Sequence, residues 1–132
     1  MIVFDASSLV SAALKEDSVP EQALLRAEET DIFAFSIAVE AEIVDVMCRP
    51  KFAGVISSQR RDRFLGVIRN SCVWFEPKMK VLDCRDAKDN KYLELALAAG
   101  AEIIVSSDED LLVLNPWRGI RVLRPSAFLA GA

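Results

Sequence analysis

The sequence contains no histidine, and this absence excludes more chemistry than any other feature of the 132-residue chain. Without imidazole there is no Ser-His-Asp or Cys-His nucleophile, no His-ligated zinc or haem, and no histidine acid–base catalyst. Cysteine is also scarce, because Cys48, Cys72 and Cys84 form no CxxC pair. Three such thiols fit a reducing compartment better than a disulfide framework. Any chemistry must therefore come from carboxylates, hydroxyls, amines or a bound ion.

Long hydrophobic runs and a leader-like start are missing as well. No apolar run approaches the ~20 residues needed to cross a membrane. The opening MIVFDASS lacks the basic start and apolar core of a signal peptide. Hydrophobic residues make up 52% of the chain and charged residues 27%, which is typical of globular proteins. We therefore expect one domain over residues 1–132, located in the cytoplasm and without membrane contact.

The net charge of −4 is unevenly distributed along the chain. Residues 49–91 hold eleven Lys or Arg against five Asp or Glu, a net charge of +6, whereas the remainder carries −10. A basic middle segment could bind a polyanion such as RNA beside a cation site in the acidic part. A solvated helix over residues 57–70 would explain the same charges. The candidate RNA-binding residues are Arg49, Lys51, Arg60, Arg61 and Arg63.

Short apolar segments alternate with helical patterns along the chain. Strands are expected over residues 2–4, 32–35, 72–75, 103–105 and 120–123. Helices are expected after a cap at Ser7 or Ser8, from Pro20, over 37–48, 57–70 and 87–99, before Pro116, and over 125–130. This alternation predicts an α/β fold, a three-layer α/β/α sandwich whose parallel sheet is covered on both faces.

Acidic residues gather where such a fold forms its sites, beyond the carboxyl ends of the strands. Asp5 follows the first strand, Asp108 and Asp110 follow the fourth, and Asp86 and Asp89 begin a helix. Several carboxylates on one edge repel one another unless a cation lies between them. All-oxygen ligands suit Mg²⁺ or Mn²⁺, which can activate water for phosphodiester cleavage. The acids at the helix starts could also act simply as caps.

Helical periodicity does not decide which of two glutamates lies at the site. The apolar face of the helix over 37–48 is centred near Ile43, and Glu40 and Glu42 fall on opposite flanks, each roughly 80° away. The pattern alone allows either glutamate at the rim of the site. The nucleotide-binding motifs GxGxxG and GxxxxGK[ST] are absent, so no phosphate cradle is predicted.

Several blocks in order resemble the PIN-domain ribonucleases, most closely the VapC-like toxins of bacterial toxin–antitoxin pairs. They are VFDASSLVSAAL, SIAVEAEIVDVMCRPKF and RDAKDNKYLELALAAGAEIIVSSDEDLLVL, and the match runs in order over essentially the whole chain. The resemblance implies a small α/β/α sandwich and an Mg²⁺- or Mn²⁺-dependent endoribonuclease that leaves a 5′-phosphate. It also implies a small cognate antitoxin, and a homodimer is expected because family members often dimerise.

The resemblance also implies roles for individual residues. By motif match the catalytic, metal-binding acids are Asp5, Glu42, Asp89 and Asp108, with Asp86 and Asp110 as further metal ligands. Ser7 and Ser106 would supply supporting hydroxyls. Ser7 stands where the family usually has Asn or Ser, and Ser106 stands where it usually has Thr. Ala6 departs from the Thr that commonly follows the first acid.

Other Mg²⁺-dependent classes fit this sequence less well. An aspartyl-nucleophile phosphatase needs a second Asp two residues after the first, where Ser7 stands. A phospho-acceptor domain needs a Lys at the end of the last strand, where the chain runs Val122-Leu123-Arg124. Two further alternatives stay open: a PIN fold that binds RNA or protein with little catalysis, and a nuclease acting on DNA or structured RNA.

Overall fold

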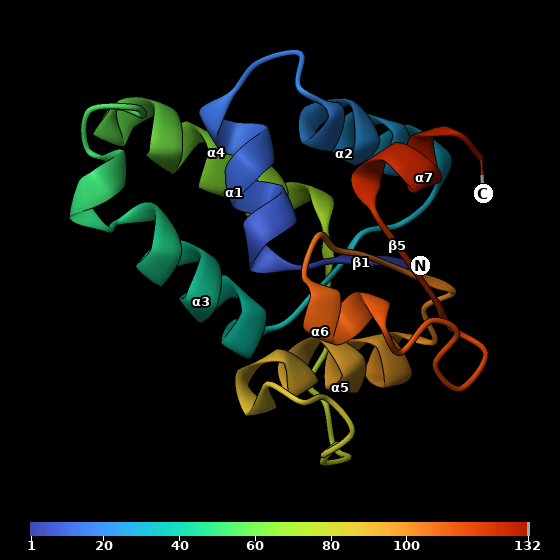
Figure 1. Cartoon of the computed structure of the whole chain (residues 1–132). Helices are drawn as coiled ribbons and strands as arrows, with labels where there is room; N and C mark the ends of the chain where they lie inside the picture. Colours follow the sequence, from blue (N-terminus) through green and yellow to red (C-terminus); the bar gives the residue numbers. More distant parts are fainter. Residues whose placement is uncertain (132) are drawn as a thin grey trace.

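The computed structural model describes residues 1–131, and its strands form a parallel sheet at the centre of the molecule (Figure 1). Strand β1 pairs with β4 and β4 with β5, while β2 pairs with β3; a bridge between Ile2 and Phe33 joins the two groups. The spatial order is therefore β3-β2-β1-β4-β5. All of these pairings are parallel, as predicted. The strands are β1 (Ile2–Phe4), β2 (Ala34–Phe35), β3 (Val73–Trp74), β4 (Ile103–Val105) and β5 (Arg121–Leu123).

Helices cover both faces of this sheet, which confirms the predicted three-layer α/β/α sandwich. Figure 1 shows α1, α2, α4 and α7 on one side and α5 and α6 on the other. Helix α1 packs against α2 and α3, and α2 packs against α7. The helices are α1 (Ala6–Leu14), α2 (Val19–Thr30), α3 (Ile37–Met47), α4 (Ser58–Ser71), α5 (Asn90–Ala99), α6 (Glu109–Leu112) and α7 (Pro125–Leu129), with 3-10 turns η1 (Pro50–Phe52) and η2 (Ala87–Asp89).

The two central strands lie in the core of the molecule. Every residue of β1 and β4 is buried, because helices cover both faces, whereas both residues of the edge strand β3 are exposed. Strands β1 and β4 run in the same direction, with Phe4 opposite Val105. The segments that follow them, beginning at Asp5 and Ser106, therefore leave the sheet at the same edge. Within residues 1–131 no helix is long and apolar enough to span a membrane.

Several element boundaries differ from the expectation. Helix α1 begins directly after β1, because its N-cap is Asp5 rather than Ser7 or Ser8. The helix expected over 87–99 opens with the 3-10 turn η2, so α-helical bonding begins at Asn90. Helix α6 ends at Leu112, before Pro116, because the amides of Leu114 and Asn115 bond three residues back instead of four. The strands at 32–35 and 72–75 pair as strands over two residues each.

Candidate active site

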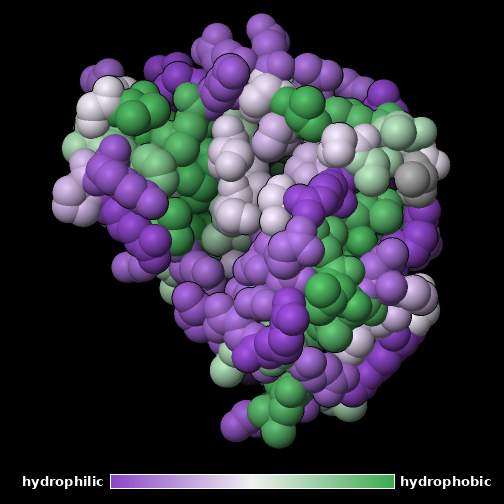
Figure 2. Space-filling view, in the orientation of Figure 1, coloured by the Kyte–Doolittle hydropathy of each residue, from purple (hydrophilic) through white to green (hydrophobic). Residues whose placement is uncertain are grey.

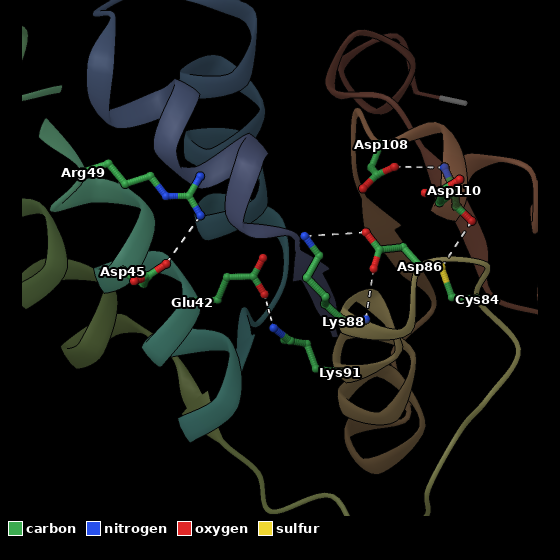
Figure 3. A network of polar contacts seen from close by, with 9 residues as sticks. All are labelled: Glu42, Asp45, Arg49, Cys84, Asp86, Lys88, Lys91, Asp108 and Asp110. Carbon is green, nitrogen blue, oxygen red and sulfur yellow. Dashed lines mark hydrogen bonds and ion pairs between the residues drawn. The ribbon is translucent and has the colours of Figure 1, made fainter. Parts of the chain in front are cut away.

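Four segments meet at the carboxyl edge of the sheet. They are the residue after β1, the loop after β4, the turn η2 with the start of α5, and the side of α3 that faces them (Figure 3). Each contributes at least one acidic side chain. In the part of the surface where α3 and α5 approach each other, hydrophilic side chains dominate, whereas hydrophobic surface gathers near α4 (Figure 2).

Asp5 is a buried carboxylate whose oxygens are fully engaged. It is 3% exposed. Its Oδ1 accepts the backbone N–H of Ser8 at 2.9 Å, and the Ser7 hydroxyl donates to both oxygens at 3.1 Å. The Ser106 hydroxyl donates to Oδ2. Burial raises the pKa of Asp5, and these hydrogen bonds oppose that rise by stabilising the charged form.

Ser106 connects the ends of the two central strands. Its hydroxyl donates to Asp5, after β1, and accepts the backbone N–H of Asp108 at 2.9 Å. Asp108 in turn caps α6, because its Oδ1 accepts the backbone N–H of Asp110 at 2.9 Å. The side chain of Ser106 is completely buried, so this link is shielded from water. The short chain of hydrogen bonds fixes Asp108 and Asp110 relative to Asp5.

A group of three carboxylates converges next to this link. Asp86, Asp89 and Asp110 each offer one oxygen, and the three oxygens lie within 4.8 Å of one another. Asp89 is 5% exposed, and among residues 1–131 its Oδ2 finds no hydrogen-bond partner. Burial, followed by hydrogen bonding to Asp108 and the charges of Asp108, Asp86 and Glu42, raises the pKa of Asp89 to about 7.

This donor set fits a hard divalent cation. A buried carboxylate oxygen without a partner is costly unless a proton or a cation satisfies it. Its neighbours supply further carboxylate oxygens and no nitrogen or sulfur ligand, which are the ligands that Mg²⁺ and Mn²⁺ favour. Asp86, Asp89 and Asp110 are therefore the residues best placed to hold such an ion.

Basic side chains from the loop before α5 and from its first turn pair with these acids. The guanidinium of Arg85 lies 2.8 Å from Asp110 Oδ1, and Lys88 Nζ lies 3.7 Å from Asp86 Oδ2. Lys91 Nζ forms an ion pair with Glu42 (Figure 3). Residues 85–91 thus carry three cations spaced three residues apart, each paired with a different acid. In the sequence these cations were visible only as part of the basic middle segment.

The two glutamates left open by periodicity face different neighbours. Glu42 points from α3 toward α5 and meets Lys91, whereas Glu40 pairs with Arg69 of α4. The charge of Glu42 contributes to the raised pKa of Asp89. The structure therefore places Glu42, the residue indicated by the family resemblance, beside the acid cluster.

Tyr92 is a buried residue of the site that sequence reasoning missed. Its hydroxyl oxygen accepts the backbone N–H of Ala6 at 3.0 Å and so ties α5 to the start of α1. Burial chiefly, with the charges of Glu42 and Asp5, raises the pKa of Tyr92. A tyrosine three residues after Asp89, inside a helix that follows the acid, was the available signal. Its contact with Ala6 depends on packing between residues 86 positions apart.

The candidate RNA-binding residues make contacts of several different kinds. Arg49 extends from the end of α3, on the Glu42 side of the site, and lies 3.4 Å from Asp45 (Figure 3). Lys51 Nζ sits 5.0 Å from the ring centroid of Phe52. On α4, the side chain of Arg61 pairs with Asp62. Arg60 and Arg63 line a groove between α1, α2 and α4.

That groove, between α1, α2 and α4, has a cavity volume of about 270 Å³. Leu25 and Val67 line it although each is about half exposed, at 50% and 52%. Charged side chains surround this apolar surface, and burial raises the pKa of one of them, Glu28. The groove is lined by none of the acids that converge at the carboxyl edge.

Comparison with known proteins connects this fold to others. Residues 1–110 match the PIN domain family. The chain is 28% identical over 116 residues to the uncharacterized protein MJ1680 of Methanocaldococcus jannaschii, covering 86% of this chain and 74% of that protein. The structure resembles PAE2754 of Pyrobaculum aerophilum, with a TM-score of 0.64 and 17% identity over 98% of this chain and 87% of the other.

A second structural neighbour is VapBC2 from Rickettsia felis, in a crystal structure of VapBC2 bound to a DNA fragment from its own promoter. The TM-score is 0.61 with 13% identity, over 92% of this chain and 97% of the other. PIN domains are generally nucleases. The match to the family spans every acid of the site, from Asp5 to Asp110. The chain belongs to the PIN domain family.

Proposed function

We propose that this protein is an Mg²⁺- or Mn²⁺-dependent endoribonuclease that acts in the cytoplasm as the toxin of a toxin–antitoxin pair. The observation that carries the metal-dependent activity is the buried Oδ2 of Asp89, which has no hydrogen-bond partner within residues 1–131 and has oxygens of Asp86 and Asp110 nearby. The sequence resemblance to VapC-like toxins and the fold shared with VapBC2 support the toxin role.

Different residues of the site would have different roles in hydrolysis. Asp89, with Asp86 and Asp110, would hold the ion, and Asp108 adds its charge next to Asp89. When bound, such an ion supplies a water of lowered pKa and neutralises phosphate charge.

Glu42 faces the cluster from α3, where it can orient the attacking water or accept its proton. Asp5 and Ser106 hold the two strand ends together, so that the acids stay aligned. Ser7 supports Asp5 through its hydroxyl.

The test is cleavage of a mixed set of labelled RNAs and single-stranded DNAs in Mg²⁺, Mn²⁺ or EDTA. We expect RNA cleavage that requires the metal, leaves 5′-phosphate ends, and falls at least ~100-fold in Asp89→Asn. Asp62→Asn removes an exposed acid on α4 that pairs with Arg61, and this control variant should cleave like the wild type. Cleavage in EDTA, or equal cleavage by Asp89→Asn, would refute the proposal. Cleavage of DNA alone would show that the substrate is wrong.

We also propose that the cognate antitoxin docks in the groove between α1, α2 and α4. Exposed Leu25 and Val67 offer apolar contact, and the acidic and basic residues around them offer charge pairing to an amphipathic segment. In this arrangement Arg60 and Arg63 serve the partner rather than RNA. Co-expression with the protein encoded beside this chain tests the proposal: Leu25→Asp should abolish co-purification and leave RNA cleavage unchanged. Retained co-purification would place the antitoxin elsewhere.

A further inference from the structure

Lys91 extends from α5 toward α3 and forms an ion pair with Glu42 (Figure 3). The side chains of this pair are 24% and 22% exposed. Arg85 and Lys88, which pair with other acids of the cluster, have side chains that are 64% and 73% exposed. Solvent and salt screen a half-buried ion pair much less than a surface pair. Of these three cations, Lys91 is therefore the one most firmly held at the site.

The surroundings of Lys91 keep its ammonium at this position. Its Nζ lies 6.0 Å from the ring centroid of Tyr92, and the Tyr92 hydroxyl is fixed by the backbone N–H of Ala6. The side chain starts in the first turn of α5, two residues after Asp89. The same short segment thus carries the ammonium and the carboxylate whose Oδ2 has no partner among the described residues.

Glu42 stands apart from the acids that converge at the site. Asp86, Asp89 and Asp110 converge on one point, and in the described part of the chain Glu42 is not a member of that group. Glu42 already has a cation, because Lys91 pairs with it. The converging group offers a place for an ion, whereas the place beside Glu42 is taken by a side chain of the protein.

We propose that the Lys91 ammonium is the second positive charge of the reaction site, so that one divalent ion per chain suffices and Glu42 binds Lys91 rather than metal. This inference rests on the proposed nuclease function. An ammonium has three N–H donors, and the pairing with Glu42 leaves donors for a substrate. Lys91 would donate to a non-bridging phosphate oxygen and stabilise the negative charge that develops there during hydrolysis.

Calorimetric titration of Mn²⁺ into the metal-free protein tests the assignment without measuring activity. We expect one ion per chain in the wild type. Glu42→Gln should still bind one ion, with an affinity within about threefold of the wild type. Lys91→Gln should bind two, because Glu42 is then free to act as a ligand. Two ions in the wild type, a tenfold loss of affinity in Glu42→Gln, or one ion in Lys91→Gln would overturn the proposal.

Cleavage by the same proteins gives the second readout. At saturating Mn²⁺ and RNA, Lys91→Gln should lose at least ~10-fold in kcat, and Lys91→Arg should recover part of it by keeping the positive charge. Lys78→Gln removes an exposed lysine that pairs with Glu76 away from the site, and should match the wild type. Wild type that neither binds Mn²⁺ nor cleaves RNA would refute the proposed function. Wild type that does both, with Lys91→Gln indistinguishable from it, would refute only the role of Lys91.

Discussion

Asp5 and Asp89 are both buried at this site, but the structure satisfies them in different ways. Hydrogen bonds from Ser7, Ser8 and Ser106 surround the carboxylate of Asp5, which caps α1. Asp89 keeps one oxygen without a partner among residues 1–131. The hydrogen bonds and the helix cap therefore offset the cost of burying the charge of Asp5, whereas Asp89 reduces stability unless a cation or a proton reaches it.

Substitutions at these two aspartates should have opposite effects on the metal-free protein. Asp5→Ala should lower the free energy of unfolding by about 1–2 kcal/mol, because it removes the helix cap. Asp89→Asn should raise it by about 1–3 kcal/mol at pH 8, because a neutral amide replaces a charge buried among other acids. Urea unfolding in EDTA measures both changes. A loss of stability in Asp89→Asn would mean that Asp89 has a structural partner.

The raised pKa of Asp89 predicts how the stability of the metal-free protein depends on pH. The pKa is about 7 in the folded protein and near 3.8 in the unfolded chain. Between these values the folded state binds more protons, so the free energy of unfolding should fall as the pH rises from about 4 to about 7. Asp89→Asn should remove that part of the decline. Parallel pH profiles of the two proteins in EDTA would contradict this assignment.

The elements of the fold differ in how well they could be predicted from sequence. Strand β4 was predicted to the residue, because a continuous apolar run buried by helices on both faces leaves few alternatives. Strands β2 and β3 are both shorter than expected, because only two residue pairs join them. The turn η2 was missed because a cap at Asp86, which the sequence allowed, does not distinguish an α-helix from a turn whose amides bond three residues back.

The arrangement of the acids at the site could also be predicted only in part from the sequence. Their position at the carboxyl edge was predictable, because strand ends and helix starts are visible in the sequence. The convergence of Asp86, Asp89 and Asp110 was not, because η2 and α6 set the directions of these side chains. The pairing of Glu42 with Lys91 joins residues 49 positions apart and depends on how α3 packs against α5.

Two glycines in helices should respond to alanine in opposite ways. Gly100 ends α5 with a φ of 62°, where a side chain is strained, although no atom lies within 4 Å of the added Cβ. Gly100→Ala should therefore cost about 1 kcal/mol. Gly66 lies inside α4 with open space around it, and Gly66→Ala should stabilise the protein by about 0.5–1 kcal/mol. Thermal unfolding checks both; equal shifts would contradict the argument.

In the whole molecule, the basic residues of the middle segment lie at two separate places. Arg85, Lys88 and Lys91 pair with acids at the carboxyl edge of the sheet. Arg60 and Arg63 line the groove beside α2. One stretch of sequence with a net positive charge thus contributes to a candidate reaction site and to a candidate partner site. The net charge of the stretch does not distinguish these two places.

The predicted homodimer would form at the β3 edge of the molecule. Ile37 is 76% exposed there and lines a cavity with Trp74, which is 41% exposed. Burying such a patch against a second copy would remove apolar surface from water. Light scattering should give a dimer mass for the wild type and a monomer mass for Ile37→Asp. A dimer that persists in Ile37→Asp would move the interface elsewhere.

The central claim is that the acid cluster at the carboxyl edge binds a divalent cation through Asp89. Mn²⁺ electron paramagnetic resonance at pH 8 measures this directly, by titrating the ion into the metal-free wild type, Asp89→Asn and Asp62→Asn. We predict that the wild type and Asp62→Asn bind Mn²⁺ with equal affinity and that Asp89→Asn loses at least ~100-fold. Equal binding by all three proteins, or no binding by the wild type, would contradict the account.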